Sequence, residues 1–297
     1  MPNWKGRFVR TAMLLEMSLL AACSPTRMQV MPVDAVLPSP APAAPLAHWT
    51  TTSTRQTESL NVTGATLRGW TFTASPDAHS RLRILFFNGN AMTIDAAQSI
   101  YRGLAVRGAD VTVFDYRGYG FSPGKPAVID FRSDSLAIYD KLAASGPVIV
   151  YGFSLGTAMA TYVASQRPVA GLILAGTIAT AKEEFPIFGR ATGYNSSELA
   201  KMMPSPDAVT AFDETGMIAK NSSPLLMIHG ESDQLVPIQE GREVFSASTA
   251  RQKQFVVVSA AGHNDTVESV TALAAVRSYL SSLPADKKIG KPIPEIK

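Results

Sequence analysis

Short, continuously apolar runs alternate with stretches of helical periodicity along the chain, and this alternation limits the folds that are open to it. The apolar runs have the length of strands and cover residues 81–89, 109–118, 147–154, 170–176, 224–230 and 253–263. Residues 130–145 and 155–166, between such runs, repeat apolar side chains with helical spacing. Strands that are apolar throughout need cover on both faces. The alternation therefore predicts an α/β fold, with a mostly parallel central sheet flanked by helices.

The chain is long enough for one large folded domain. It has 297 residues, of which 46% are hydrophobic, so it can bury a full core. We expect this domain to cover residues 56–284, with short antiparallel edge strands within residues 60–75. Residues 285–297 are polar and interrupted by proline, which predicts a loose tail.

The N-terminal segment predicts export. Residues 1–22 begin with a basic stretch and continue as a short apolar run that ends in small residues, the layout of a secretory signal peptide. The ending "LLAAC" resembles a bacterial lipobox, which implies that Cys23 becomes the lipidated first residue of the mature chain. Ser24, where some lipoproteins have aspartate, implies anchoring in the outer membrane, facing the periplasm. Residues 23–55, with their proline- and alanine-rich stretch, are then an extended tether.

The sequence Gly152-Phe153-Ser154-Leu155-Gly156 places a hydroxyl between two glycines where an apolar run gives way to a helical pattern. A G-x-S-x-G turn from strand to helix holds the serine in a strained backbone conformation above the edge of the sheet. Side chains at the two glycine positions would collide with the neighbouring strand and helix. The start of the following helix favours developing negative charge. Ser154 is therefore the predicted nucleophile, with an ordinary turn as the alternative.

A serine nucleophile needs a histidine base, and the chain has four histidines. His48, in the linker, and His79, in a polar turn, are expected to face solvent. His229 ends an apolar run and is expected to be a structural histidine. His263 follows the last apolar run, in the loop "AAGHND", and is the predicted base.

The acid that orients the base should lie between nucleophile and base in the chain, at the end of another strand. Asp233, in "HGESDQLVP", meets both conditions. Glu231 is closer to the strand but short of the apex of the loop. Asp265 is a local alternative, for which the expected role is a cap on the last helix.

An oxyanion hole requires two backbone donors. The first is the N–H of Leu155, directly after the nucleophile. The second is expected in the loop "NGNAM", where the N–H of Asn90 is preferred and that of Ala91 is the alternative. Gly89 allows the backbone to pass close to a substrate. The alternative interpretation of this loop is an ordinary glycine turn with no part in an oxyanion hole.

The motifs "FFNGNA", "DYRGYGFSPGKP", "YGFSLG", "HGESDQLVP" and "AAGHND" occur in the order and spacing of the α/β-hydrolase superfamily. Over residues 60–283 the chain most resembles the Bem46-like, serine-aminopeptidase-type branch. Proteins of that branch commonly have His-Gly-Asn where this chain has Asn88-Gly89-Asn90. Asparagine in place of histidine changes a side-chain contact and leaves the backbone donor in place. The second motif marks this branch, and we expect Asp115 and Arg117 to brace the loops around the site.

The resemblance places a short lid at about residues 181–223. The apolar residues of this insertion are Phe185, Ile187, Phe188, Met202, Met203 and Met217. They either pack the lid on the core or form a wall for an acyl chain. Both interpretations predict an apolar site that suits a modest acyl chain better than a charged peptide.

The predicted function is hydrolysis of a small-molecule ester or thioester through an acyl-enzyme on Ser154. A serine at this position excludes the mechanism of relatives that open epoxides or displace halide with an aspartate nucleophile. The sequence has no H-E-x-x-H motif and no clustered ligand set, so we expect no metal and no cofactor. A formal net charge of +3 without a basic stripe argues against nucleic acid. The alternatives are an amidase or peptidase with the same triad and a non-catalytic binding protein of this fold.

Overall fold

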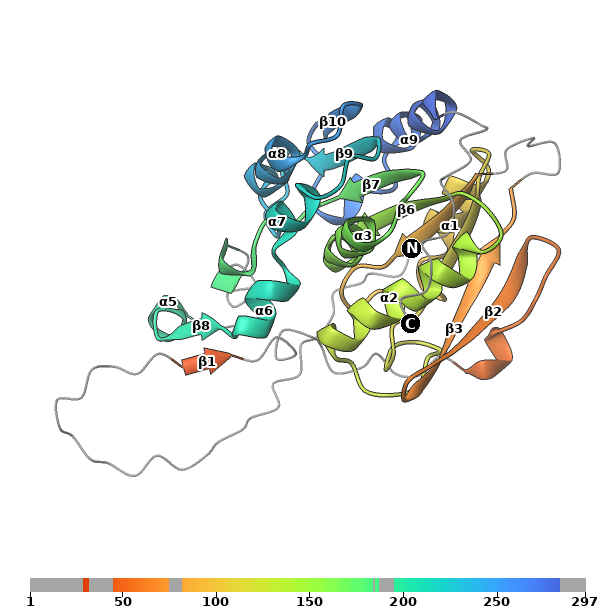
Figure 1. The fold of residues 1–297 in the computed structure, drawn as a ribbon, viewed down its shortest axis with the longest axis horizontal. Helices are drawn as coiled ribbons and strands as arrows, with labels where there is room; N and C mark the ends of the chain where they lie inside the picture. The colour runs from red at the N-terminus through yellow and green to blue at the C-terminus, as the bar shows by residue number, and fades with distance from the viewer. Residues whose placement is uncertain (1–28, 32–44, 75–81, 184, 187–194, 284–297) are drawn as a thin grey trace, which may run out of the picture.

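The protein contains one large sheet, seen in a computed structural model that describes residues 29–31, 45–74, 82–183, 185–186 and 195–283 (Figure 1). The sheet has eight strands in the order β10, β9, β7, β6, β4, β5, β3, β2. The strands are β2 (Arg55–Val62), β3 (Ala65–Phe72), β4 (Arg83–Phe87), β5 (Asp110–Phe114), β6 (Val148–Phe153), β7 (Gly171–Ala175), β9 (Leu225–Gly230) and β10 (Lys253–Val258). Each predicted apolar run contains one of the strands β4 to β10 of this sheet.

Strand directions follow from what lies between the strands. A tight turn joins β2 and β3, which pair antiparallel, and β3 also pairs antiparallel with β5. All other neighbours in the sheet are parallel, because the segments between them are long enough to cross over the sheet. The predicted α/β fold with a mostly parallel sheet and antiparallel edge strands is confirmed.

Helices cover both faces of the sheet. The helices are α1 (Gln98–Ala105), α2 (Val128–Ala143), α3 (Leu155–Gln166), α8 (Ile238–Ala247) and α9 (Val270–Ser282). Helices α1 and α9 lie on one face of the sheet, and helices α2, α3 and α8 lie on the other (Figure 1). All residues of the central strand β6 are buried, which is why the sequence of this strand is continuously apolar.

The last helix starts later than the sequence suggested. Helix α9 begins at Val270, and its cap is Ser269, whose side chain accepts the N–H of Ala272 at 3.0 Å. Asp265 was expected as this cap, and that prediction is wrong. Its carboxylate instead accepts the N–H of Gly262 at 3.2 Å, within the loop. Residues 264–266 form a separate short 3-10 turn, so the chain bends before α9 starts.

The insertion after β7 forms a small layer beside the sheet. It contains α5 (Ser196–Leu199), β8 (Met202–Pro204), α6 (Pro206–Ala211) and α7 (Glu214–Ile218). Helix α7 lies against α3, the helix that follows the predicted nucleophile (Figure 1). Strand β1 (Gln29–Met31) pairs in parallel with β8. Part of the segment that was expected to be a tether therefore contacts the insertion.

Several predictions fall on residues outside the described part of the chain. These are the signal peptide at 1–22, Cys23, His79, Ile187, Phe188 and the tail at 285–297. Among the helices that are described, none is both long and apolar enough to cross a membrane.

Candidate active site

Ser154 sits on a sharp turn between β6 and α3. Its backbone has φ 53° and ψ −123°, a conformation that L-residues rarely adopt. The glycines on either side are required sterically. A Cβ atom at Gly152 would lie 2.3 Å from the carbonyl oxygen of Gly156, and one at Gly156 would lie 2.1 Å from that of Phe87. The turn can therefore form only with glycine at both positions, as the sequence predicted.

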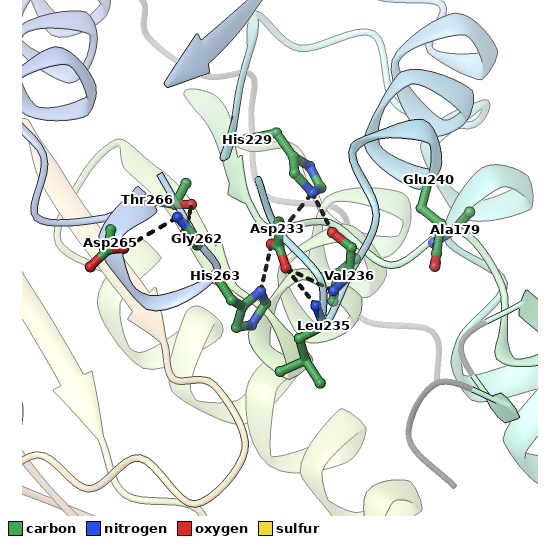
Figure 2. A network of polar contacts seen from close by, with 10 residues as sticks. All are labelled: Ala179, His229, Asp233, Leu235, Val236, Glu240, Gly262, His263, Asp265 and Thr266. Atoms are coloured by element: carbon green, nitrogen blue, oxygen red, sulfur yellow. Dashed lines mark hydrogen bonds and ion pairs between the residues drawn. The ribbon is translucent and has the colours of Figure 1, made fainter. Parts of the chain in front are cut away.

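Asp233 and His263 form a hydrogen-bonded pair beside this turn (Figure 2). The Nδ1–H of His263 donates to Oδ2 of Asp233 at 2.7 Å. The other carboxylate oxygen accepts the N–H groups of Leu235 and Val236 at 3.0 and 2.9 Å. The carboxylate is fully buried, whereas the imidazole is 9% exposed. Asp233 is thus fixed through one carboxylate oxygen by backbone N–H groups, and it holds His263 through the other.

The alternative acids have other partners. Glu231 accepts the N–H of Ala260 at 3.2 Å, and Asp265 stays within its own loop. The loops after β9 and β10 are joined by backbone hydrogen bonds, among them Ser232 N–H to Ala261 O at 3.0 Å. These bonds bring Asp233 and no other predicted acid to the histidine, among the residues that are described.

The end of β7 lies between the predicted nucleophile, Ser154, and the predicted base, His263. The N–H of Ser154 donates to the carbonyl of Ala175 at 2.9 Å. A Cβ atom at the next residue, Gly176, would lie only 3.1 Å from Cε1 of His263. The ring of Phe153, next to the serine, lies 5.1 Å from the imidazole, measured between centroids. Ser154, Asp233 and His263 therefore gather at the carboxyl ends of neighbouring strands of the sheet.

The predicted oxyanion loop passes beside the serine. A Cβ atom at Gly89 would lie 3.4 Å from Cβ of Ser154, so the loop after β4 and the turn are in contact. Asn90 is in this loop, and its side-chain oxygen accepts the hydroxyl of Tyr119 at 3.2 Å. Leu155 is the first residue of α3, where backbone N–H groups have no partner within the helix. Both predicted donors are thus on segments adjacent to Ser154.

Comparison with known proteins identifies the family. A family model described as the alpha/beta hydrolase fold matches residues 83–204. An uncharacterized protein of Mycobacterium tuberculosis is 31% identical over 225 residues, which cover 73% of this chain and 76% of that protein. The chain belongs to the α/β-hydrolase superfamily. Lysophosphatidylserine lipase ABHD12 of Macaca fascicularis is 32% identical over 209 residues, covering 63% of this hydrolase-fold chain and 51%, about half, of the lipase.

Solved structures of α/β hydrolases show the same fold. The esterase PF2001 of Pyrococcus furiosus aligns with a TM-score of 0.62 and 16% identity, over 86% of this chain and 98% of the esterase. A soluble variant of the monoglyceride lipase of Saccharomyces cerevisiae aligns with a TM-score of 0.57 and 16% identity, over 77% and 96%. Identity at this level supports the fold alone.

Two tyrosines that sequence reasoning did not assign support the predicted oxyanion loop of this α/β hydrolase. The hydroxyl of Tyr101 donates to the side-chain oxygen of Asn88 at 2.7 Å, and that of Tyr116 donates to the carbonyl of Asn88 at 2.9 Å. Burial raises the pKa of both tyrosines well above the usual value, so both stay protonated donors. Of the two, only Tyr116 lies in a motif that the sequence analysis singled out, "DYRGYG". Asn88 therefore serves to fix the loop.

Asp115 and Arg117 of this motif contact loops and helices around the site. The carboxylate of Asp115 accepts the N–H groups of Ile94 and Phe121 at 2.8 and 2.9 Å, and burial raises its pKa to about 7. The guanidinium of Arg117 forms two bonds with Asp134, at 2.6 and 2.8 Å. These contacts agree with the predicted bracing role.

The two other histidines that the structure describes, His229 and His48, lie where the sequence suggested. His229 is fully buried, and its Nε2–H donates to the carbonyl of Val236 at 2.9 Å. Burial lowers its pKa, so the ring is neutral and structural, and its bond to Val236 supports the loop that carries Asp233 (Figure 2). His48 is exposed, 3.5 Å from Asp95.

Metal-ligating side chains do not cluster in the part of the chain that the structure describes. No group of three histidine, cysteine, aspartate or glutamate residues there is arranged to hold a metal ion. The site consists of one hydroxyl, one carboxylate and one imidazole. The carboxylate–imidazole hydrogen bond fixes the protonated nitrogen, which leaves the other nitrogen free to accept a proton.

Proposed function

We propose that this α/β hydrolase cleaves a carboxylic ester or thioester through an acyl-enzyme on Ser154, and that it belongs to the Bem46-like branch. One observation carries the proposal. A serine held at φ 53° on a strand–helix turn lies beside a histidine that is fixed by a buried carboxylate at 2.7 Å. A protein that needed only a stable turn would have no use for such a strained residue next to a fixed base.

In the proposed mechanism, Ser154 Oγ attacks the acyl carbon while His263 Nε2 takes its proton. Asp233 keeps the other proton of the imidazole on Nδ1 and stabilises the imidazolium that forms. The N–H groups of Leu155 and Asn90 bind the oxyanion. His263 then protonates the leaving alcohol or thiol, and a water molecule, activated by the same histidine, hydrolyses the acyl-enzyme.

The ester preference rests on the apolar insertion and on the relatives. Phe185, an apolar residue of the insertion, is only 9% exposed. One relative named above is a lysophosphatidylserine lipase, and two solved structures that share the fold are an esterase and a monoglyceride lipase. Met217, in contrast, lines a cavity of about 280 Å³ between α2 and the helices α6 and α7. That cavity contains no residue of the proposed triad, which favours a packing role for Met217.

A substrate panel tests the proposal. Turnover is measured with p-nitrophenyl esters of increasing acyl length, acyl-CoA thioesters and aminoacyl anilides. We expect hydrolysis of short or medium esters and thioesters and little hydrolysis of anilides. Faster turnover of the anilides would indicate an amidase or peptidase instead. No turnover of any class, by a protein that binds the substrates, would indicate a binding protein.

We also propose that the protein is exported and anchored through a lipid on Cys23, in the outer membrane facing the periplasm. The basic N-terminal stretch and the "LLAAC" ending support this. Cys23→Ser should accumulate as unprocessed precursor, whereas the neighbouring Ser24→Ala should be processed and sediment with membranes. Mass spectrometry of the mature N-terminus is the measurement. An unmodified chain that is cleaved elsewhere and free in solution would contradict the anchor.

A further inference from the structure

A carboxyl group lies buried directly behind the nucleophile turn. Glu214 is the first residue of α7, in the insertion, and is fully buried. One carboxyl oxygen lies 2.6 Å from the hydroxyl of Thr157 and the other lies 3.0 Å from that of Thr161, both on α3. Within the described part of the chain, no cationic side chain bonds to it. The insertion thus contributes a buried acid to the helix that starts at the serine.

The hydrogen bonds at Thr157 require a proton on this acid. The hydroxyl of Thr157 lies 2.6 Å from Oε1 of Glu214 and 2.7 Å from the carbonyl oxygen of Ser154. A hydroxyl has one proton and cannot donate to both oxygens. If Glu214 is a neutral acid, its O–H donates to Thr157, and Thr157 donates to Ser154. All of these short contacts are then hydrogen bonds.

The surroundings of Glu214 favour the neutral form. Burial raises its pKa well above the usual value, and the charge of Glu240 on α8 raises it further. Both glutamates bond to Ala179. The Glu240 carboxylate accepts the N–H of Ala179 at 2.9 Å, and the backbone N–H of Glu214 donates to the carbonyl of Ala179 at 3.0 Å. Helix α3 presents only the two neutral threonines. No neighbour therefore compensates a negative charge at Glu214.

The hydrogen bonds from Glu214 through Thr157 end at the carbonyl of the peptide between Ser154 and Leu155. It accepts both the hydroxyl of Thr157 at 2.7 Å and its backbone N–H at 2.8 Å. A trans peptide is planar, with its C=O and N–H bonds pointing in opposite directions. Fixing the carbonyl of Ser154 therefore fixes the direction of the Leu155 N–H, the proposed oxyanion donor.

We propose that Glu214, as a neutral acid, is a positioning residue that acts through Thr157 to aim the Leu155 N–H at the oxyanion. The inference rests on the proposed serine-hydrolase function. It adds that the insertion, through Glu214, helps to orient a donor that stabilises the transition state. It predicts that breaking the hydrogen bonds from Glu214 through Thr157 to Ser154 lowers kcat and leaves KM nearly unchanged, because the oxyanion forms only after the substrate has bound.

Three variants separate positioning from simple packing. Thr157→Val keeps the shape of the side chain and removes the link, so we expect kcat to fall by about tenfold or more, part of the effect of removing an oxyanion donor. Glu214→Gln offers an amide N–H to Thr157 and should retain a kcat close to that of the wild type. Thr161→Val removes the other bond of the same carboxyl, which does not reach Ser154. We expect it to lower the melting temperature as Thr157→Val does, with a much smaller loss of kcat.

Protonation of Glu214 is tested separately. The infrared difference between wild type and Glu214→Gln at pH 7 should contain the carbonyl band of a protonated carboxylic acid. As pH rises through the raised pKa, kcat of the wild type should fall, and this fall should be absent in Glu214→Gln. An ionised carboxylate band at pH 7, or equal kcat losses in Thr157→Val and Thr161→Val, would overturn the inference. If the wild type instead has no reactive serine, the proposed function fails, whatever the infrared result.

Discussion

Replacement of Ser154 by alanine is expected to lower kcat for p-nitrophenyl acetate by about a million-fold, the size of loss that removal of the serine causes in another serine hydrolase triad. The reason is that alanine offers no oxygen for the acyl-enzyme. The fold should persist, because the Cβ atom at φ 53° is already accommodated in the wild type. The measurement is steady-state kinetics, combined with thermal unfolding of both proteins.

A serine on the same helix serves as the matched control. The hydroxyl of Ser165 donates to the carbonyl of Tyr162, away from the turn. Ser165→Ala should therefore retain the wild-type rate. An alanine variant at position 154 that is folded and still hydrolyses the ester near the wild-type rate would contradict the proposed mechanism.

Asp233→Asn is expected to reduce kcat by about ten-thousand-fold. Oδ1 of Asp233 accepts two backbone N–H groups, so an asparagine oxygen would take that place and the amide NH₂ would face His263. The imidazole would then present an unprotonated Nδ1 to this amide and carry its proton on Nε2. A histidine in this tautomer cannot take the proton of the serine.

The other acids near the histidine are the controls for this variant. Glu231→Gln and Asp265→Asn change carboxylates that accept the backbone N–H groups of Ala260 and Gly262 and not the imidazole of His263. Each should cost far less in kcat than Asp233→Asn. The reverse order of effects would assign the acid of the triad to another residue.

Most of the sheet could be predicted from the sequence, because the strands are buried on both faces and read as apolar runs. The ends of the strands could not. The apolar run 253–263 contains β10, which stops at Val258, because the chain turns at Ala260, where φ is 56°. Ala261 of this run is buried and packs in the loop that carries His263, whereas Ser259 and Ala260 are exposed. Hydrophobicity alone does not distinguish such a packed loop from a strand.

The positions of the three proposed triad residues were predictable because each follows its own strand, and parallel strands bring their carboxyl ends to one edge. Contacts between side chains of distant segments were not predictable. Glu214 and Thr157 are 57 positions apart and meet only because α7 packs on α3. The cap at Ser269 was missed for a local reason, since residues 264–266 form a separate turn and move the start of the helix.

Labelling with a fluorophosphonate tests the central claim most directly. Only a serine that is activated by a base and served by an oxyanion hole reacts rapidly with such a probe. The wild-type protein is treated with the probe, digested, and the modified peptide identified by mass spectrometry. We expect one adduct, on Ser154, which is absent in Ser154→Ala and forms much more slowly in Asp233→Asn. A folded wild-type protein that remains unlabelled, or carries the adduct on another residue, would contradict the account.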